Sequence, residues 1–251
     1  ARATFLWYNP PRGWQGAGPH PPRGSCRHAM VQSEEARPAR AMHILAVSDQ
    51  VDSSIYNTNV RERFGHVDLV LSCGDLPYDY LEFVVTMLGV PVFYVHGNHD
   101  QARVLREDGW HTQEGPGGCI SLEGRVVVHQ GLLLAGLGGS MRYRLDGNFQ
   151  YTERQMALRL LRLKPRLLWN RWRRGRALDI LVTHAPPRGI HDAADLCHTG
   201  FQVFRDFIDC YRPRFFVHGH VTPIGLASRI TQIGPTTVVN AYGYQLITLE
   251  L

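Results

Sequence analysis

The stretch VPVFYVHGNHDQ, residues 90–101, indicates the fold because a strand-like run ends in groups that bind metals and protons. The run VPVFYV (90–95) consists mostly of the β-branched and aromatic residues that favour strands. An amide, an imidazole and a carboxylate follow it shortly, at Asn98, His99 and Asp100. In α/β proteins, ligands bind just beyond the ends of the strands, so this segment is a candidate site.

Two earlier runs end in the same way, and helical spacing separates all three. The strand-like runs are Met42–Val47, Val67–Ser72 and Val90–Val95, and the segments with helical spacing are Ile55–Phe64 and Tyr80–Leu88. This β-α-β-α-β alternation predicts parallel strands joined by right-handed crossovers. The carboxyl ends of such strands meet at one edge, so Asp49, Asp75 and Asn98 should lie close together.

From Gly117 the pattern changes to short strands separated by glycine turns, with two further helices. We expect strands at Ile120–Leu122, Arg125–His129, Leu132–Ala135, Asp179–Thr183, Arg214–Val217, Gly225–Ile230, Thr236–Asn240 and Tyr244–Leu249. We expect helices at Thr152–Arg174, interrupted at Pro165, and at Phe201–Tyr211. The sum predicts the α/β class, with a two-sheet β-sandwich flanked by helices.

The composition excludes several classes of protein. The chain has 251 residues, 44% of them hydrophobic, which suffices for one domain plus a tail. The sequence contains no run of about eighteen apolar residues, so we expect no membrane-spanning helix. The five cysteines are odd in number and show no CxxC spacing, so we expect reduced thiols in a cytoplasmic protein. The formal charge of +5 favours acidic substrates.

Residues 1–41 differ in composition from the rest of the chain. The segment NPPRGWQGAGPHPPRGS (9–25) is rich in Pro, Gly and Arg and has no hydrophobic period. Such a segment buries too little surface to offset its ordering entropy, so we expect a disordered tail. We expect the functional domain to span residues 42–251. Whether the tail belongs to the native protein, or acts as a basic arm for nucleic acid, stays open.

Metal-binding side chains gather at the predicted strand ends. They are Asp49, Asp75, Asn98 with His99, His184, and His220 with His218. Carboxylate and amide oxygens together with imidazoles suit Mn²⁺, Fe²⁺ or Zn²⁺. A carboxylate between two ions can bridge them, and two-metal sites catalyse phosphoryl transfer.

The five motifs that contain these residues resemble those of the calcineurin-like metallophosphoesterases, in particular the bacterial predicted phosphoesterases, over residues 42–251. The motifs are Ser48-Asp49-Gln50-Val51, Gly74-Asp75, Gly97-Asn98-His99-Asp100, Thr183-His184-Ala185-Pro186 and Gly219-His220-Val221-Thr222. The resemblance implies a four-layer sandwich and one or two divalent ions, Mn, Fe or Zn.

The resemblance also implies a role for each residue. Asp75 would bridge two metals, Asp49 would serve the first, and the second would be completed by Asn98, His184 and His220. His99 would be the proton donor next to the leaving oxygen, and Asp100 would orient it.

Two ligands of the family's first metal site are replaced, by Val51 and Thr222. Three accounts stay open. In the first, the enzyme works with one tightly held metal. In the second, neighbouring residues rebuild the first metal site, with Asp52 as the replacement ligand and Gln50 beside it. In the third, the domain only binds a ligand and does not catalyse a reaction.

Two segments are candidates for substrate recognition. The basic segment 159–176 is either a helix pair whose Leu/Trp face covers the core, a cap over the metal site, or a membrane-surface element. The loop after His184 carries Arg188, His191 and His198 as candidate substrate-binding residues, or is simply a stiff surface loop. Arg142 and Tyr143 are weaker candidates. Segment 152–176 would be an insertion in the domain.

The function predicted from the sequence is metal-dependent hydrolysis of a phosphomonoester or phosphodiester by metal-activated water, at a site with His99 and Asp100 as catalytic residues. The alternative is a catalytically impaired phosphate-binding or scaffold module that keeps the fold. We expect a phosphorylated small molecule or nucleotide as substrate, and neither nucleic acid nor membrane as a partner.

Overall fold

The computed structural model describes residues 41–101, 104–105, 112–225 and 228–250. The expected tail, residues 1–41, lies outside this range apart from Ala41, so its prediction stays untested.

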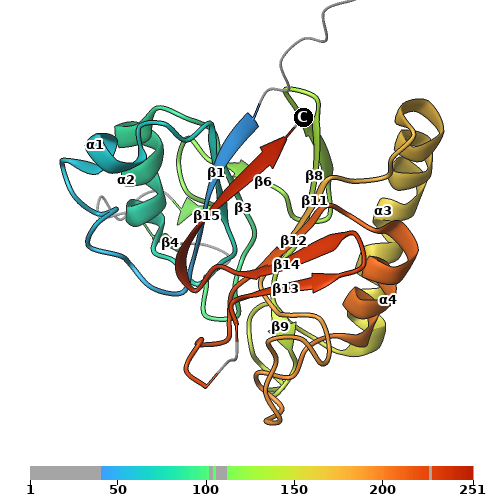
Figure 1. The fold of residues 1–251 in the computed structure, drawn as a ribbon. Helices are drawn as coiled ribbons and strands as arrows, with labels where there is room; N and C mark the ends of the chain where they lie inside the picture. Colours follow the sequence, from blue (N-terminus) through green and yellow to red (C-terminus); the bar gives the residue numbers. More distant parts are fainter. Residues whose placement is uncertain (1–40, 102–103, 106–111, 226–227, 251) are drawn as a thin grey trace, which may run out of the picture. The chain divides into compact units, whose positions relative to one another are not determined.

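The first large sheet contains the three strands that open the domain. Its order is β15 (Gly243–Glu250), β1 (Ala41–Ser48), β2 (Leu69–Ser72), β3 (Val92–Tyr94) and β6 (Ile120–Ser121). The four strands β1, β2, β3 and β6 are parallel, and β15 pairs with β1 in the antiparallel direction. Figure 1 shows β15, in red, beside β1, in blue. The predicted parallel arrangement of the first three strands is therefore confirmed.

The second large sheet has parallel strands in its centre and antiparallel strands at both edges. Its order is β13 (Ile230–Ile233), β14 (Thr236–Asn240), β12 (Phe215–His218), β11 (Ile180–Thr183), β8 (Leu132–Leu137) and β7 (Val126–His129). Two small sheets pair β9 (Ser140–Met141) with β10 (Gln150–Tyr151), and β4 (Val104–Leu105) with β5 (Thr112–Gln113). The parallel strands β11 and β12 lead directly into the histidine motifs.

The two sheets pack face to face around a shared apolar core. Successive side chains of a strand point to opposite faces, so each strand also contributes to a second cluster under the helices. In β1, Ile44 belongs to a core cluster shared with the second sheet, whereas Leu45 belongs to the cluster under the first pair of helices. In β11, Val182 lies in the shared cluster and Leu181 in the cluster under the second pair. Both faces of these strands are buried, which explains their continuous apolar sequences.

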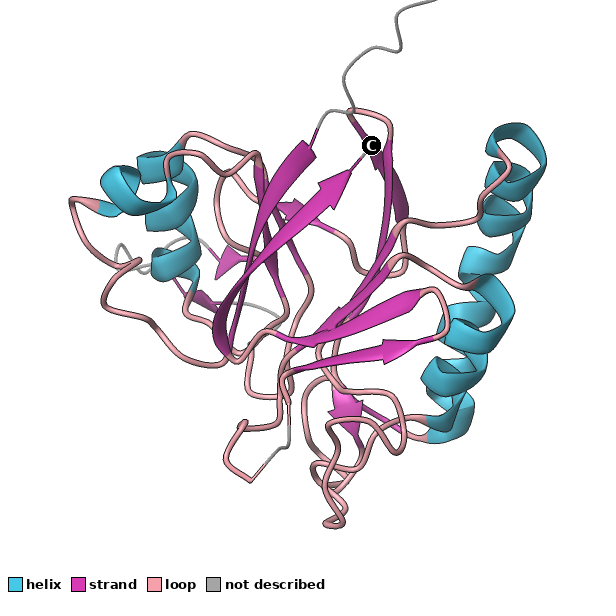
Figure 2. Ribbon diagram, viewed as in Figure 1, coloured by secondary structure: helices cyan, strands magenta, loops and turns pink. Residues whose placement is uncertain are grey.

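Helices cover the outer face of each sheet, as Figures 1 and 2 show. The helices α1 (Val60–Phe64) and α2 (Tyr78–Leu88) cover the first sheet, and α3 (Glu153–Arg174) and α4 (Gln202–Tyr211) cover the second. The order of layers is therefore helix, sheet, sheet, helix. This confirms the predicted four-layer α/β sandwich.

Two predicted element boundaries are wrong. The segment Ile55–Phe64 is helical only from Val60, because turns closed by side chains occupy the residues before it. Asp52 accepts hydrogen bonds from Ser54, and Asn57 accepts one from the backbone of Asn59.

The predicted strand Gly225–Ile230 instead begins at Ile230, and Gly225 has a φ of +82° that no strand uses.

The predicted interruption of the long helix at Pro165 is also wrong, since α3 continues through it. Pro165 removes the partner of the Leu161 carbonyl, but both residues are exposed, so water can satisfy that carbonyl. Leu163 and Leu167 face the second sheet, as the amphipathic interpretation expects. The tryptophans do not cover the core, because Trp169 and Trp172 are 49% and 75% exposed.

No helix among the described residues is long and apolar enough to cross a membrane.

A partly buried ion pair joins α3 to the loop that carries the Gly97-Asn98-His99-Asp100 motif. Arg159 pairs with Glu123 and also donates to the Gly138 carbonyl at 2.7 Å. Glu123 Oε1 accepts hydrogen bonds from the backbone N–H groups of His96 and Gly138, at 2.9 and 3.1 Å. Burial alone would raise the pKa of Glu123, but the His96 side chain, the Arg159 charge and the His96 backbone N–H hold it below its ordinary value.

Replacing Arg159 with methionine should destabilise the fold by about 3 kcal/mol, because the Glu123 carboxylate would stay buried without its counter-charge. Urea denaturation of wild type and Arg159→Met measures the loss. Arg162→Met, an exposed arginine of the same helix, is the matched control and should change stability by less than about 0.5 kcal/mol.

The same pair predicts the pH dependence of this loss. Interactions that lower a carboxyl pKa contribute stability above its unfolded value, about 4.3. They lose it as pH falls through the lower folded-state value. The stability difference between wild type and Arg159→Met should therefore shrink from about pH 5 to about pH 3. A difference that stays constant over this range would contradict the assigned role of Glu123.

Candidate metal centre

Four candidate ligands from both sheets meet where the parallel strands end. Asp49 follows β1, Asp75 follows β2, His184 follows β11 and His220 follows β12. One ligand atom from each residue lies within 4.8 Å of the others. The topology alone brings them together, because each follows the carboxyl end of a parallel strand.

Asn98, which follows β3, joins the same group through its amide oxygen. His184 Nε2 lies 3.0 Å from Asn98 Oδ1 and 3.2 Å from the Asp75 carboxylate. The other ring nitrogen of His184 donates to the Cys73 carbonyl at 2.8 Å, which orients the ring. His184 and Asn98 are 0% and 5% exposed, whereas Asp49 and Asp75 are half-buried, so the group is open to solvent on its carboxylate side.

Three of these residues have a strained backbone conformation. Asp49, Asp75 and His220 have φ values of +62°, +56° and +68°, in the left-handed region that side chains other than glycine seldom adopt. Such strain concentrates at functional sites.

Glycines let the chain segments approach closely. A Cβ at Gly97 would lie 2.0 Å from Asp75 Oδ1, and one at Gly219 would lie 1.9 Å from Ser48 Oγ. These two glycines are therefore required by geometry, which explains the glycine of the Gly-Asn-His-Asp sequence and that of the Gly-His sequence.

Opposite charges share this buried space. Burial alone would lower the pKa of His184, but the charges of Asp75 and Asp49 raise it to about 9. Burial alone would raise the pKa of Asp75, but His184 lowers it to about 2. Burial raises the pKa of Asp49. Burial and then the charge of His184 lower the pKa of His220 to about 3.

These features fit a divalent cation. Two carboxylates, an amide oxygen and two imidazoles are donors that Mn²⁺, Fe²⁺ and Zn²⁺ accept. Without an ion, protonated His184 supplies the positive charge that the carboxylates require. A cation in the same place would do so more fully, with His184 neutral as a ligand.

The next two motif residues have different surroundings. His99 is exposed, and its backbone N–H donates to Asp75 Oδ1 at 2.8 Å. The Asp100 carboxylate accepts from the backbone N–H groups of Gly97 and Asp75, at 2.7 and 3.1 Å. Asp100 thus fixes the two loops that carry the ligands, and its predicted role in orienting the His99 ring stays a proposal.

Val51 and Thr222 stand at the two positions where the family motifs have a histidine ligand. Val51 is 40% exposed and Thr222 is exposed. Asp52, the predicted replacement ligand, belongs to neither potential metal-binding group found in the described part of the chain. Its carboxylate accepts from the Ser54 backbone and hydroxyl. Asp52, Gln50 and Thr222 together line a cavity of about 720 Å³, whose lining includes none of the four candidate ligands.

The loop after β11 contains the three predicted substrate-binding residues, and His198 is in contact with one of the candidate ligands. Arg188 is exposed, and its backbone N–H bonds to the Phe201 carbonyl. His191 is buried between Thr231 and His218, with both ring nitrogens in hydrogen bonds, at 2.8 and 3.0 Å. His198 lies against His220, with ring centroids 5.0 Å apart.

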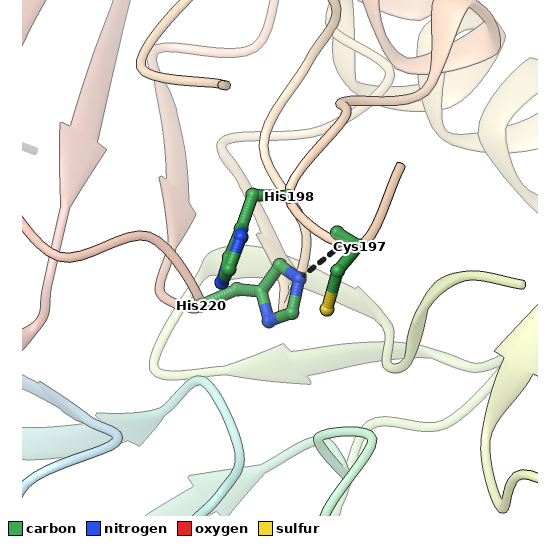
Figure 3. Close-up of side chains that lie close together, drawn as sticks. All are labelled: Cys197, His198 and His220. Carbon is green, nitrogen blue, oxygen red and sulfur yellow. Dashed lines mark hydrogen bonds between the residues drawn. The ribbon is translucent and has the colours of Figure 1, made fainter. Parts of the chain in front are cut away.

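Sequence reasoning missed Cys197 and gave too little weight to Tyr143. Cys197, His198 and His220 form a second group of potential ligands, shown in Figure 3. Asn98 Nδ2 donates to the Tyr143 hydroxyl at 3.3 Å, so Tyr143 touches the first group. The adjacency of Cys197 and His198 was a signal, but neither lies at a strand end.

A model of the calcineurin-like phosphoesterase family matches residues 42–222, more than half of the chain. The chain belongs to this family. Calcineurin-like phosphoesterases hydrolyse phosphoesters with divalent metals, and the Asp49, Asp75, His184 and His220 group is where this member gathers its candidate ligands.

Solved structures agree with the calcineurin-like phosphoesterase fold. The protein TT1561 of Thermus thermophilus is 17% identical, with 84% of this chain and 99% of that chain covered at a TM-score of 0.55. Another crystal structure is 15% identical and covers 83% of this chain and 95% of its own, at a TM-score of 0.59. No curated protein matches the sequence significantly.

Removing the Asp75 charge should abolish stabilisation by metal. Mn²⁺ at a hundredfold excess over its Kd should stabilise wild type by about 2.7 kcal/mol, seen as a rise in Tm. Asp75→Asn should show no such rise. Asp79→Asn, an exposed carboxylate at the start of α2, should respond like wild type. An unchanged Tm response in Asp75→Asn would exclude Asp75 as a ligand.

Proposed function

We propose that the chain is a metal-dependent phosphoesterase that hydrolyses a phosphomonoester or phosphodiester. The observation that carries this proposal is the convergence of Asp49, Asp75, His184 and His220 within 4.8 Å, with Asn98 Oδ1 beside them. These donors come from separate strand ends of two sheets, and three of them lie on strained backbone. A purely structural role would not require that strain.

The chain's residues hold and orient the reacting groups. Asp49, Asp75, Asn98, His184 and His220 would bind the cation, and Asp75 is proposed to bridge to a second one. A bound divalent cation would offset charge on the phosphoryl oxygens and make water a better nucleophile. The half-buried carboxylates would leave one side of the cation open to water and substrate, while the buried imidazoles and Asn98 hold its other side.

His99 is the proposed general acid. Its backbone N–H is tied to Asp75, so the residue is anchored at the metal group while its side chain is exposed to an incoming substrate. A protonated imidazole there would give its proton to the alkoxide oxygen that leaves phosphorus. Asp100 supports this by holding the backbone of Gly97 and Asp75.

The substrate proposed is a phosphorylated small molecule or a nucleotide. The 720 Å³ cavity whose lining begins at Gln50, the residue after Asp49, is within the range of small-molecule sites. Gln50, Thr222 and Arg229 line it, and they offer an amide, a hydroxyl and a cation. We propose Mn²⁺ as the metal on the donor set, and a cytoplasmic location on the unpaired state of the four described cysteines.

The alternative function is a phosphate-binding or scaffold module without catalysis. The observation that favours it is the absence of imidazoles at Val51 and Thr222, two ligand positions of the family's first metal site. The remaining ligand group favours the enzyme, since a module that only binds phosphate needs no strained carboxylate pair.

Hydrolysis of p-nitrophenyl phosphate and its bis ester with Mn²⁺ decides between the two. Wild type should hydrolyse at least one of them, and Asn98→Ala should abolish that activity. If the activity of Asn98→Ala equals that of wild type, the hydrolysis does not depend on the proposed metal site. If metal-loaded wild type hydrolyses neither ester, the result favours the binding module.

His99→Ala tests the proposed general acid. The variant should keep the Mn²⁺-dependent rise in Tm and lose about a hundredfold or more in kcat. His66→Ala, an exposed histidine before β2, should keep full activity. Full activity of His99→Ala would exclude the role, and loss of the Tm response would show that His99 acts through metal binding instead.

A further inference from the structure

The loop between β11 and α4 places a thiol and an imidazole against His220. One ligand atom each of Cys197, His198 and His220 lies within 4.8 Å of the others. Figure 3 shows the two side chains of the loop on either side of the His220 ring. His220 Nε2 also donates to the Cys197 carbonyl at 2.8 Å, so the loop backbone is fixed at the same point.

His198 has the arrangement of a metal ligand with an orienting carboxylate. Its Nδ1 lies 2.7 Å from Asp195 Oδ2, and its backbone N–H donates to the same oxygen at 3.3 Å. The carboxylate holds the proton on Nδ1 and leaves the Nε2 lone pair available. Metal-ligating histidines commonly donate their second ring N–H to a carboxylate, which fixes the tautomer and the ring.

Cys197 is held by a second chain of contacts. Its thiol is half-buried, which raises the pKa of the thiol, and the Tyr143 hydroxyl partly offsets this rise. That hydroxyl accepts from Asn98 Nδ2 at 3.3 Å. The thiol is thus linked to the first ligand group through Tyr143, although Cys197 comes from a loop outside the five motifs.

The donor chemistry of this group differs from that of the first group. A thiolate and two imidazoles are softer than carboxylate and amide oxygens, and Zn²⁺ prefers them. Three protein ligands also leave a fourth tetrahedral position open, as in catalytic zinc sites.

We propose that Cys197, His198 and His220 form a zinc site that shares His220 with the oxygen-rich group. Zinc binding takes the proton from the Cys197 thiol and releases it to solvent, and the sulfur then bonds to the ion. His220 is common to both groups, so occupancy of one affects the other. The proposal does not depend on phosphoester hydrolysis, because it concerns binding alone.

Cobalt titration tests the site without any activity assay. Co²⁺ replaces Zn²⁺ in such sites and gives an intense thiolate-to-cobalt absorption in the near ultraviolet. Metal-free wild type should develop this band, and added Zn²⁺ should remove it by displacing the cobalt. Cys197→Ser should never develop it. His198→Ala should bind cobalt at least tenfold more weakly while keeping the thiolate band at saturation.

The matched control is Cys210→Ser, which removes an exposed thiol of α4 that belongs to neither group. It should titrate like wild type. Failure of wild type to develop the band would overturn the proposal whatever the variants do. Persistence of the band in Cys197→Ser would overturn it as well, by assigning the thiolate to another cysteine. An unchanged Tm of metal-free Cys197→Ser would show that its fold is intact.

Discussion

Two hydrogen bonds join the sheets where their parallel strands end, and the metal centre depends on them. The His220 backbone N–H of the second sheet donates to Asp49 Oδ2 of the first at 2.8 Å. His184 Nδ1 donates to the Cys73 carbonyl across the same gap, also at 2.8 Å. Because the pair of sheets shares one apolar core, these contacts fix the distance between ligands that come from opposite layers. The strained backbone of Asp49 and His220 is maintained by that packing.

Much of the fold and of the first ligand group could be predicted because both depend on local patterns. The apolar runs before Asp49, Asp75 and Asn98 are short and end in turns, and parallel strands bring such ends together. His184 and His220 follow the same rule in the second sheet. Strand order alone is therefore enough to predict that these five residues lie close together.

The rest depended on contacts that no pattern of the sequence contains. The Asp52 and Asn57 side chains replace the first turns of the expected helix before Val60. His191 has the sequence context of a loop ligand, but the structure buries it against His218. Cys197 and Tyr143 reach the site from loops whose paths are set by tertiary hydrogen bonds, so neither follows the strand-end rule that located the first ligand group.

The pairing of β1 with β15 has a consequence for the order of folding. All eight residues of β1, the strand that leads into Asp49, pair with the strand formed by residues 243–250. During synthesis β1 can pair with β2 early, but its other edge has no partner until the last of these residues leaves the ribosome. Contacts of such long sequence separation form late and slowly. The nascent chain therefore carries an unpaired strand edge from the time β1 emerges until residues 243–250 follow it, and such edges invite association with other chains.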